Sequence, residues 1–160
     1  MENYIMLNGK RIDLTAEQIE TLVGAIDPFK EGASPYYFIN SMGELKEDTE
    51  VHDIWQEERY AVANHCTDKE LMEQRALHET LSRLLWRYSM QHGGREIDWN
   101  DNSKGKWLIY FAYPVGKFNV AYHTIIRNIS ELHFATRAAA ESAIEEIVKP
   151  FMEKHPEFRW

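Results

Sequence analysis

The chain repeats one short pattern, since Asn64-His65-Cys66-Thr67-Asp68-Lys69 returns as Leu132-His133-Phe134-Ala135-Thr136-Arg137. In both segments an extended apolar stretch ends, and a small oxygen-bearing residue, Asp68 or Thr136, stands where a helix N-cap is expected. The repetition predicts two similar units, over residues 36–92 and 107–152. Each unit is expected to hold three short strands followed by an amphipathic helix. This order predicts the α+β class, with an antiparallel sheet packed on helices.

A small lobe is predicted before the two units. Asn8-Gly9 separates two short strand-like runs and favours the type I′ turn of a hairpin. Thr15 and Gln18 have the spacing of a capping box, and the helix that they begin should end at Asp27-Pro28. The sequence thus predicts a hairpin–helix lobe over residues 1–28 and a two-unit α+β domain over residues 36–160.

Inside the first unit, strands are expected at residues 36–40 and 60–64, and the segment between 44 and 58 is part strand and part loop. A long helix should run from about Lys69 to His92 and end at Gly93-Gly94. The second unit should contain a hairpin over residues 107–122, a third strand over 129–134, and a helix that Pro150 kinks or ends. The expected buried stripes of the two helices are Leu77, Leu81, Leu84, Leu85 and Tyr88, then Ala140, Ala143, Ile144, Ile147, Val148 and Phe151.

Composition limits the classes of function. The chain has 160 residues and a formal net charge of -8, which disfavours generic affinity for phosphate backbones. One cysteine, Cys66, excludes an intramolecular disulfide and favours a reducing compartment. The longest apolar run, over residues 107–113, is too short to cross a bilayer as a helix, and the first residues lack a signal-peptide pattern. We therefore expect a cytoplasmic protein of the host cell with no membrane partner.

The strongest local bias is acidic and lies between residues 44 and 58. Carboxylates around an exposed aromatic side chain can dock into a basic protein groove, where the aromatic ring anchors and the charges steer. A solvated strand edge explains the same residues more simply, and a metal or catalytic site is the third interpretation. The candidate partner-binding residues are Asp48, Glu50, Asp53, Trp55, Glu57 and Glu58.

Motifs for catalysis, metals and phosphates are missing from the sequence. Neighbouring histidines are ten or more residues apart, so none form an i, i+4 pair on a helix. A structural zinc site needs four ligands, and Cys66 is the only cysteine. Gly93-Gly94 follows a predicted helix, whereas phosphate-binding loops follow a strand. We predict no catalytic residue, no metal ligand and no cofactor, and a small enzyme is the interpretation with the least support.

A nucleic-acid-binding accessory protein is the main alternative. Three arginines lie on one side of the long predicted helix, because they are four or eight residues apart, and a fourth follows the helix. Glu79 falls between two of them, which is typical of ordinary helix stabilisation. The candidate nucleic-acid-binding residues are Arg75, Arg83, Arg87 and Arg95.

Four further motifs occur in the first hundred residues: Leu7-Asn8-Gly9-Lys10 with Leu14-Thr15-Ala16-Glu17-Gln18, Tyr36-Tyr37-Phe38-Ile39-Asn40 with Gly43, Glu58-Arg59-Tyr60 leading to Asn64, and Asp98-Trp99-Asn100. In these motifs, with a weaker echo in residues 134–136, the chain resembles a family of small uncharacterised proteins from phages and mobile elements of Gram-positive bacteria. It departs from the family pattern where Ala63 replaces a glycine and Cys66 replaces an aromatic residue. The resemblance implies a mobile-element origin and transfers no catalytic residues.

These observations predict a non-enzymatic protein that binds a macromolecule. If the chain comes from a mobile element, the more specific hypothesis is that it is an acidic inhibitor of a host defence nuclease. Its action would then be similar to that of an anti-CRISPR protein. The expected partner is a host or phage protein with a basic surface, and nucleic acid is the second expectation. Exposed strand edges also leave open a homo-oligomer.

Overall fold

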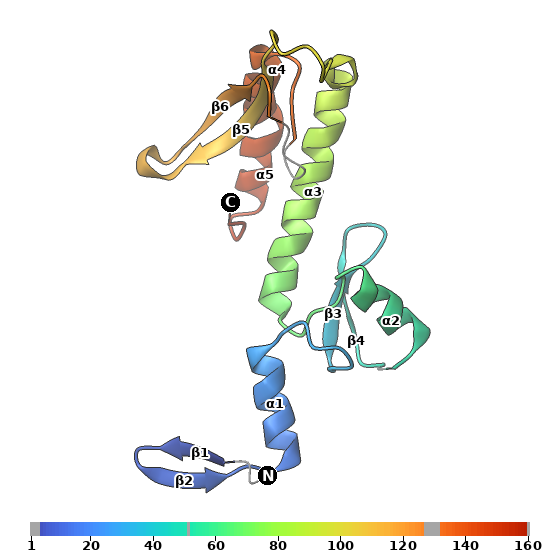
Figure 1. The fold of residues 1–160 in the computed structure, drawn as a ribbon, viewed down its shortest axis with the longest axis vertical. Helices are drawn as coiled ribbons and strands as arrows, with labels where there is room; N and C mark the ends of the chain where they lie inside the picture. Colours follow the sequence, from blue (N-terminus) through green and yellow to red (C-terminus); the bar gives the residue numbers. More distant parts are fainter. Residues whose placement is uncertain (1–3, 51, 127–131, 160) are drawn as a thin grey trace. The chain divides into compact units, whose positions relative to one another are not determined.

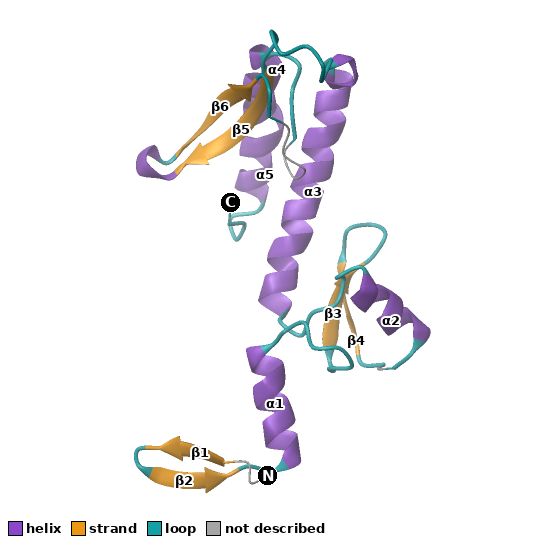
Figure 2. Cartoon of the chain, viewed as in Figure 1, coloured by secondary structure: helices purple, strands orange, loops and turns teal. Residues whose placement is uncertain are grey.

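The computed structural model describes residues 4–50, 52–126 and 132–159 of the chain. Two compact units make up the protein, Met1–Ala76 and Leu77–Trp160, and the boundary falls inside a long helix. Figure 1 shows helices together with antiparallel hairpins in the described residues, and Figure 2 marks them by type. The predicted α+β class is therefore confirmed.

The first unit starts with the predicted hairpin and helix. Asn8 and Gly9 have φ angles of 50° and 77°, as a type I′ turn requires. The capping box is formed, because the Gln18 N–H donates to Thr15 Oγ1 at 3.2 Å and the Thr15 N–H donates to Gln18 Oε1 at 2.9 Å. The elements of this unit, in order, are β1 (Tyr4–Leu7), β2 (Lys10–Asp13), α1 (Ala16–Ile26), β3 (Tyr36–Ile39), β4 (Leu45–Asp48), α2 (Ile54–Ala61) and the beginning of α3 (Lys69–Gln91).

The predicted strand over residues 60–64 is wrong, because Tyr60 and Ala61 belong to α2. Two side chains make this segment helical. Asp53 caps the helix, since its Oδ1 accepts the N–H of Gln56 at 2.6 Å. The buried Gln56 amide in turn contacts the ring of His65, with 3.2 Å between the two Nε2 atoms. Tertiary contacts thus outweigh the strand propensity of a short apolar run.

A single-residue bridge takes the place of the third strand in this unit. Cys66 pairs with Tyr37 on the side of β3 that faces away from β4, through N–H···O bonds of 2.7 and 3.1 Å. Two residues earlier, the Asn64 side chain imitates a strand: its Oδ1 accepts the N–H of Ile39 at 2.9 Å and its Nδ2 donates to the carbonyl of Ile39 at 2.8 Å. The outer edge of β3 is therefore hydrogen-bonded at both of its outward-facing residues.

The second unit has the same plan. The hairpin of β5 (Lys106–Ala112) and β6 (Lys117–His123) pairs in antiparallel register from Lys106↔His123 to Ala112↔Lys117. Phe134 bridges to Trp107 through N–H···O bonds of 2.9 and 2.7 Å. Of the predicted strand over 129–134, residues 132–134 are described and only Phe134 among them forms a bridge, whereas residues 129–131 lie outside the described residues. The helices are the end of α3, the 3₁₀ turns Gly94–Glu96 and Tyr113–Val115, α4 (Arg137–Ala143), a π-helical segment (Ile144–Val148) and α5 (Lys149–Lys154).

The repeated segments of the sequence have matching structures. In each, the second residue is a buried histidine, the third forms the bridge, and the fifth caps the following helix. Asp68 Oδ1 accepts the N–H of Leu71 at 3.0 Å, and Thr136 Oγ1 accepts the N–H of Ala139 at 3.1 Å. The matched pairs are His65 with His133, Cys66 with Phe134, and Asp68 with Thr136.

The predicted apolar stripes lie in the cores. Gly93 ends α3 in the left-handed region, with a φ of 85°, as predicted. Pro150 follows the π-helical segment, which fits a residue that has no N–H and crowds the carbonyl four positions earlier. The first unit buries Ile39, Cys66, Met72 and Ala76, and the second buries Leu81, Leu85, Tyr88, Phe134, Ala139, Ala140, Ala143, Val148, Phe151 and Phe158.

Ala63 has a φ of 55°, in the left-handed region that favours glycine. An L-residue there costs about 1–2 kcal/mol, and the extra freedom of unfolded glycine returns about 0.5–1 of this. We therefore expect Ala63→Gly to raise the free energy of unfolding by about 0.5–1 kcal/mol, measured by urea denaturation. Ala61→Gly, two residues away at the end of α2, should lower it instead. A loss of stability in both variants would contradict this account.

Candidate functional site

One side of α2 is exposed and combines apolar with acidic side chains. Ile54, Trp55 and Val62 are 64%, 61% and 69% exposed, and the carboxylates of Glu57 and Glu58 lie among them. Ile54, Glu58 and Val62 follow at intervals of four residues, so they share one face of the helical turn. We call the set Ile54, Trp55, Glu57, Glu58 and Val62 the α2 face.

Arg59 holds α2 on the β3–β4 hairpin. Its Nη1 donates to the hydroxyl of Tyr36 at 2.6 Å and to Oδ2 of Asp48 at 2.8 Å. The guanidinium carbon lies 3.6 Å from the centroid of the Phe38 ring. The hydrogen bond from Arg59 lowers the pKa of Asp48, and burial raises the pKa of Tyr36. This cluster fixes which side of α2 faces outward.

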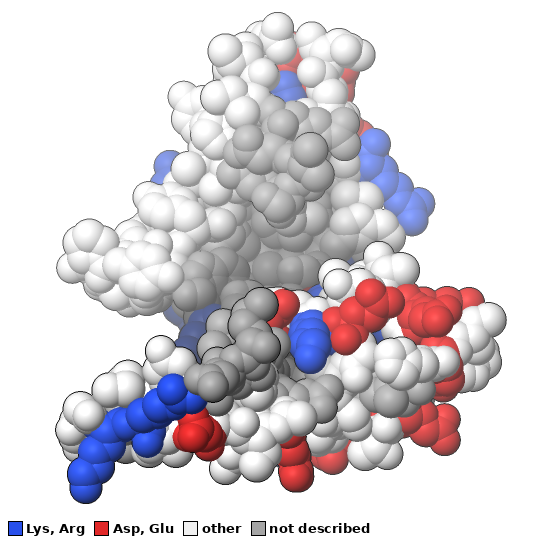
Figure 3. All heavy atoms as spheres, turned by 60° about the horizontal axis from the view of Figure 1, so that its bottom comes forward, with Lys and Arg blue, Asp and Glu red and all other residues white. Residues whose placement is uncertain are grey.

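The structure divides the six candidate acidic-segment residues into two groups. Asp48 pairs with Arg59, and Asp53 caps α2, so both support the local structure. The other four are exposed: Glu50, Trp55, Glu57 and Glu58. Figure 3 shows acidic side chains gathered on one part of the surface in view. Sequence reasoning missed both Ile54 and Val62 as site residues and placed Val62 in a strand; their exposure on one face follows from the helical spacing of 54, 58 and 62.

The negative charge of the chain lies in the first unit. Residues 1–76 hold 7 Lys and Arg against 16 Asp and Glu, a formal charge of −9. Residues 77–160 hold 11 against 10, a formal charge of +1. The α2 face therefore belongs to a strongly anionic unit, and the second unit is almost neutral.

The four candidate arginines do not belong to one unit. Arg75 lies in the first unit, where its Nη1 donates to the carbonyl of Ala63. Arg83 lies in the second and forms an ion pair with Glu79, with 3.0 Å between Nη2 and Oε2. Arg87 and Arg95 are exposed there. This placement does not favour the nucleic-acid alternative.

The described residues offer little support for a metal site, a reactive cysteine or a catalytic histidine. Within them, no three His, Cys, Asp or Glu side chains are placed to hold a metal ion. Cys66 is fully buried, and burial raises the pKa of its thiol. Burial also lowers the pKa of His65, whose Nε2 accepts from Gln56 and so needs the neutral ring. None of the helices described here has the length and apolar content to cross a membrane.

Comparison of the chain with protein-family models, with curated proteins and with solved structures finds no match. The resemblance to phage and mobile-element proteins therefore stays a prediction.

Proposed function

We propose that this chain is a non-enzymatic binding protein that docks the α2 face on a basic surface of a partner protein. The observation that carries the proposal is the group of three exposed apolar side chains, Ile54, Trp55 and Val62, within an acidic unit. A solvated helix face needs no such apolar group. An interface does, because a buried aromatic anchor supplies most of the binding energy.

The carboxylates of the α2 face indicate that the partner surface carries positive charge. Glu57 and Glu58 form no ion pair with any described residue, so their charges are available to an incoming cation. The formal charge of −9 on residues 1–76 adds a long-range attraction for a basic surface. Such attraction raises the association rate and weakens as salt rises.

The sharper form of the proposal is inhibition of a host defence nuclease. A nuclease binds phosphates in a basic groove, and the α2 face would offer carboxylates to that groove in their place. This form rests on the mobile-element resemblance as well as on charge. The partner is then a protein of a Gram-positive host.

Capture from host lysate, followed by titration with the purified partner, tests the proposal. We expect Trp55→Ala to weaken binding by at least about tenfold, because it removes the anchor. The matched control is Trp86→Ala in the second unit, since Trp86 is 57% exposed and Trp55 61%. The captured protein should be basic, and the control should bind it as wild type does. Equal binding by both variants, or no capture at low salt, would refute the proposal.

A charge reversal in the same assay tests whether the negative charge at this position of the α2 face, and not only the net charge of the chain, attracts the partner. Glu58→Lys and Glu153→Lys each change the net charge from -8 to −6, and both side chains are exposed. Only Glu58→Lys should reduce affinity and flatten its salt dependence. If DNA or RNA is instead retarded in a gel, and Arg83→Glu/Arg87→Glu abolishes the retardation, the accessory-protein alternative holds.

A further inference from the structure

A relay of hydrogen bonds in the first unit locks the ring of His65 in one protonation state. Gln56 and His65 are 2% and 1% exposed, and their two Nε2 atoms lie 3.2 Å apart. The other end of the Gln56 amide is fixed, because its Oε1 accepts the backbone N–H of His52 at 2.7 Å. A backbone N–H can only donate, so the amide nitrogen of Gln56 is the donor to His65. The ring is therefore neutral, with its proton on Nδ1.

A second proton on His65 finds no acceptor in this relay. With Nε2 protonated, the N–H of the ring meets the N–H of the Gln56 amide. Turning the amide over only moves the conflict, because the amide nitrogen then meets the backbone N–H of His52. Two donors that face each other away from water are both unsatisfied, and the cost is larger when one of them is charged. Protonation therefore has to break a contact of Gln56.

The other neighbours of the ring are two tyrosines and an ion pair. Tyr36 of β3 stacks on His65 with the ring centroids 4.5 Å apart, and Tyr60 of α2 meets it edge-on at 5.9 Å. Arg59 donates to the Tyr36 hydroxyl and to Asp48 of β4, so a cation and its counter-ion both lie on the far end of this stack. The pair contributes little net charge at the ring.

Two groups before β3 favour the charged ring, and burial opposes them. The backbone of Ala33 and the negative charge of Glu31 both raise the pKa of His65. Burial has the larger effect, and it lowers this pKa below the ordinary value of 6.5. The folded first unit thus favours the neutral ring that the relay requires.

The place of Gln56 in α2 decides which part of the helix moves. Gln56 lies in the first turn, where its N–H is held by the Asp53 cap, and Ile54 and Trp55 belong to the same turn. Arg59, further along the helix, holds the remainder on the β3–β4 hairpin through bonds that do not involve the imidazole. Loss of the Gln56 contact therefore frees the first turn and leaves the later part of α2 in place.

We propose that protonation of His65 releases the first turn of α2, so that the α2 face loses its apolar anchor in acid. A histidine with a lowered folded pKa gives stability that is fully present above the unfolded pKa and is lost as the pH falls through the folded value. The α2 face is thus complete at neutral pH and incomplete in acid. Release of the turn follows from the relay alone, whereas its effect on binding rests on the proposed function.

Long-range ¹H–¹⁵N NMR spectra of the labelled protein test the relay. At neutral pH we expect Nε2 of His65 to have the ¹⁵N shift of an unprotonated ring nitrogen, and Nδ1 that of a protonated one. As the pH falls, the titration of the ring and the loss of helical ¹³Cα shifts at Ile54, Trp55 and Gln56 should follow one curve. A proton on Nε2 at neutral pH, or helical shifts that persist once the ring is charged, would overturn the proposal.

Gln56→Glu changes the relay at a single group. A carboxylate accepts at both ends, so it can take the N–H of His52 and that of a protonated His65. We expect the ring to titrate at a higher pH than in wild type and the first turn to stay helical when the ring is charged. Gln91→Glu is the matched control, since it adds the same charge at an exposed position of the second unit. Identical curves for Gln56→Glu and wild type would contradict the relay.

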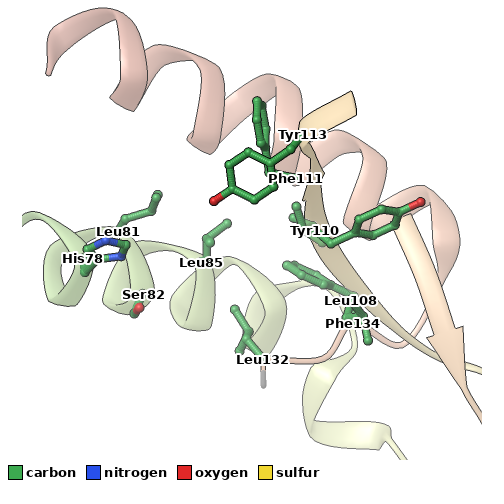
Figure 4. Close-up of a pocket in the computed structure, with 11 residues that line it drawn as sticks. His78, Leu81, Ser82, Leu85, Leu108, Tyr110, Phe111, Tyr113, Leu132 and Phe134 are labelled. Carbon is green, nitrogen blue, oxygen red and sulfur yellow. The ribbon is translucent and has the colours of Figure 1, made fainter. Parts of the chain in front are cut away.

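His65→Gln removes the titrating group itself. A glutamine oxygen can accept from Gln56 and carries no charge at any pH, so the first turn should stay helical in acid. The control is His78→Gln in the second unit, where the side chain is exposed, and Figure 4 shows it on α3 beside Leu81. This control should lose the turn as wild type does. If His65→Gln also loses it, another group is responsible and the proposal fails.

Binding to the captured partner separates this inference from the proposed function. Between neutral and acidic pH, the affinity of wild type should fall at least about tenfold more than that of His65→Gln, as expected for loss of the Trp55 anchor. Release of the first turn with unchanged affinity would refute the proposed function and leave this inference standing. Loss of affinity while the turn stays helical would refute this inference and leave the proposed function standing.

Discussion

Replacing Phe134 by alanine is expected to lower the free energy of unfolding of the second unit by about 3–5 kcal/mol. Phe134 is 1% exposed and belongs to a core cluster that includes side chains of α3 and α4. Its backbone also forms the bridge to Trp107, so a cavity at this position lies beside the hairpin. The loss combines the transfer free energy of the ring with the contacts missing around the cavity.

Urea denaturation followed by tryptophan fluorescence measures this change. In a Trp55→Phe background the remaining tryptophans, at positions 86, 99, 107 and 160, all belong to the second unit. Tyr122→Ala is the control, because this ring is 57% exposed and should cost far less. Equal losses in the two variants would show that Phe134 does not hold the core together.

Arg59→Ala should destabilise the first unit by about 2–4 kcal/mol. The substitution leaves the buried hydroxyl of Tyr36 without its donor and Asp48 without its cation, and it uncovers the ring of Phe38. Lys46→Ala is the control from the same hairpin. Lys46 pairs with Glu44 on the exposed surface, where an ion pair contributes about 0–1 kcal/mol.

The dependence of stability on pH, compared between wild type and Asp48→Asn, identifies the charge involved. Arg59 lowers the pKa of Asp48 below its ordinary 3.8 in the folded protein. A lowered folded pKa gives stability that is fully present above the unfolded pKa and is lost as the pH falls through the folded value. Wild type should therefore lose this contribution below about pH 4, and Asp48→Asn should not. An unchanged acid profile in Asp48→Asn would contradict the role of this ion pair.

Local signals in the sequence predicted the elements that they govern. Asn8-Gly9 forms its turn, Thr15 and Gln18 form their capping box, and Asp68 and Thr136 cap the helices that follow. Each of these depends on residues within four positions of one another. Short-range hydrogen bonding and backbone preference decide them, so no knowledge of the tertiary fold is needed.

Prediction failed where distant contacts decide. Residues 60–64 have the composition of a strand, but α2 forms because Gln56 finds its partner in His65 and Arg59 finds its partners on the β3–β4 hairpin. The same contacts set which acidic residues are exposed: Asp48 turns to Arg59, whereas Glu57 and Glu58 face outward. The role of Asn64 depends on the register of its segment against β3. That register cannot be read from the hydrophobic pattern of the sequence or from secondary-structure propensities.

The presence of two similar units in one chain bears on how many ligands the chain can hold at once. One polypeptide contains two units of the same construction whose surfaces differ: residues 1–76 have a formal charge of −9 and carry the α2 face, and residues 77–160 have a formal charge of +1. Where each unit binds a ligand of its own, a ligand held by one unit is kept near the other at an effective concentration on the order of millimolar.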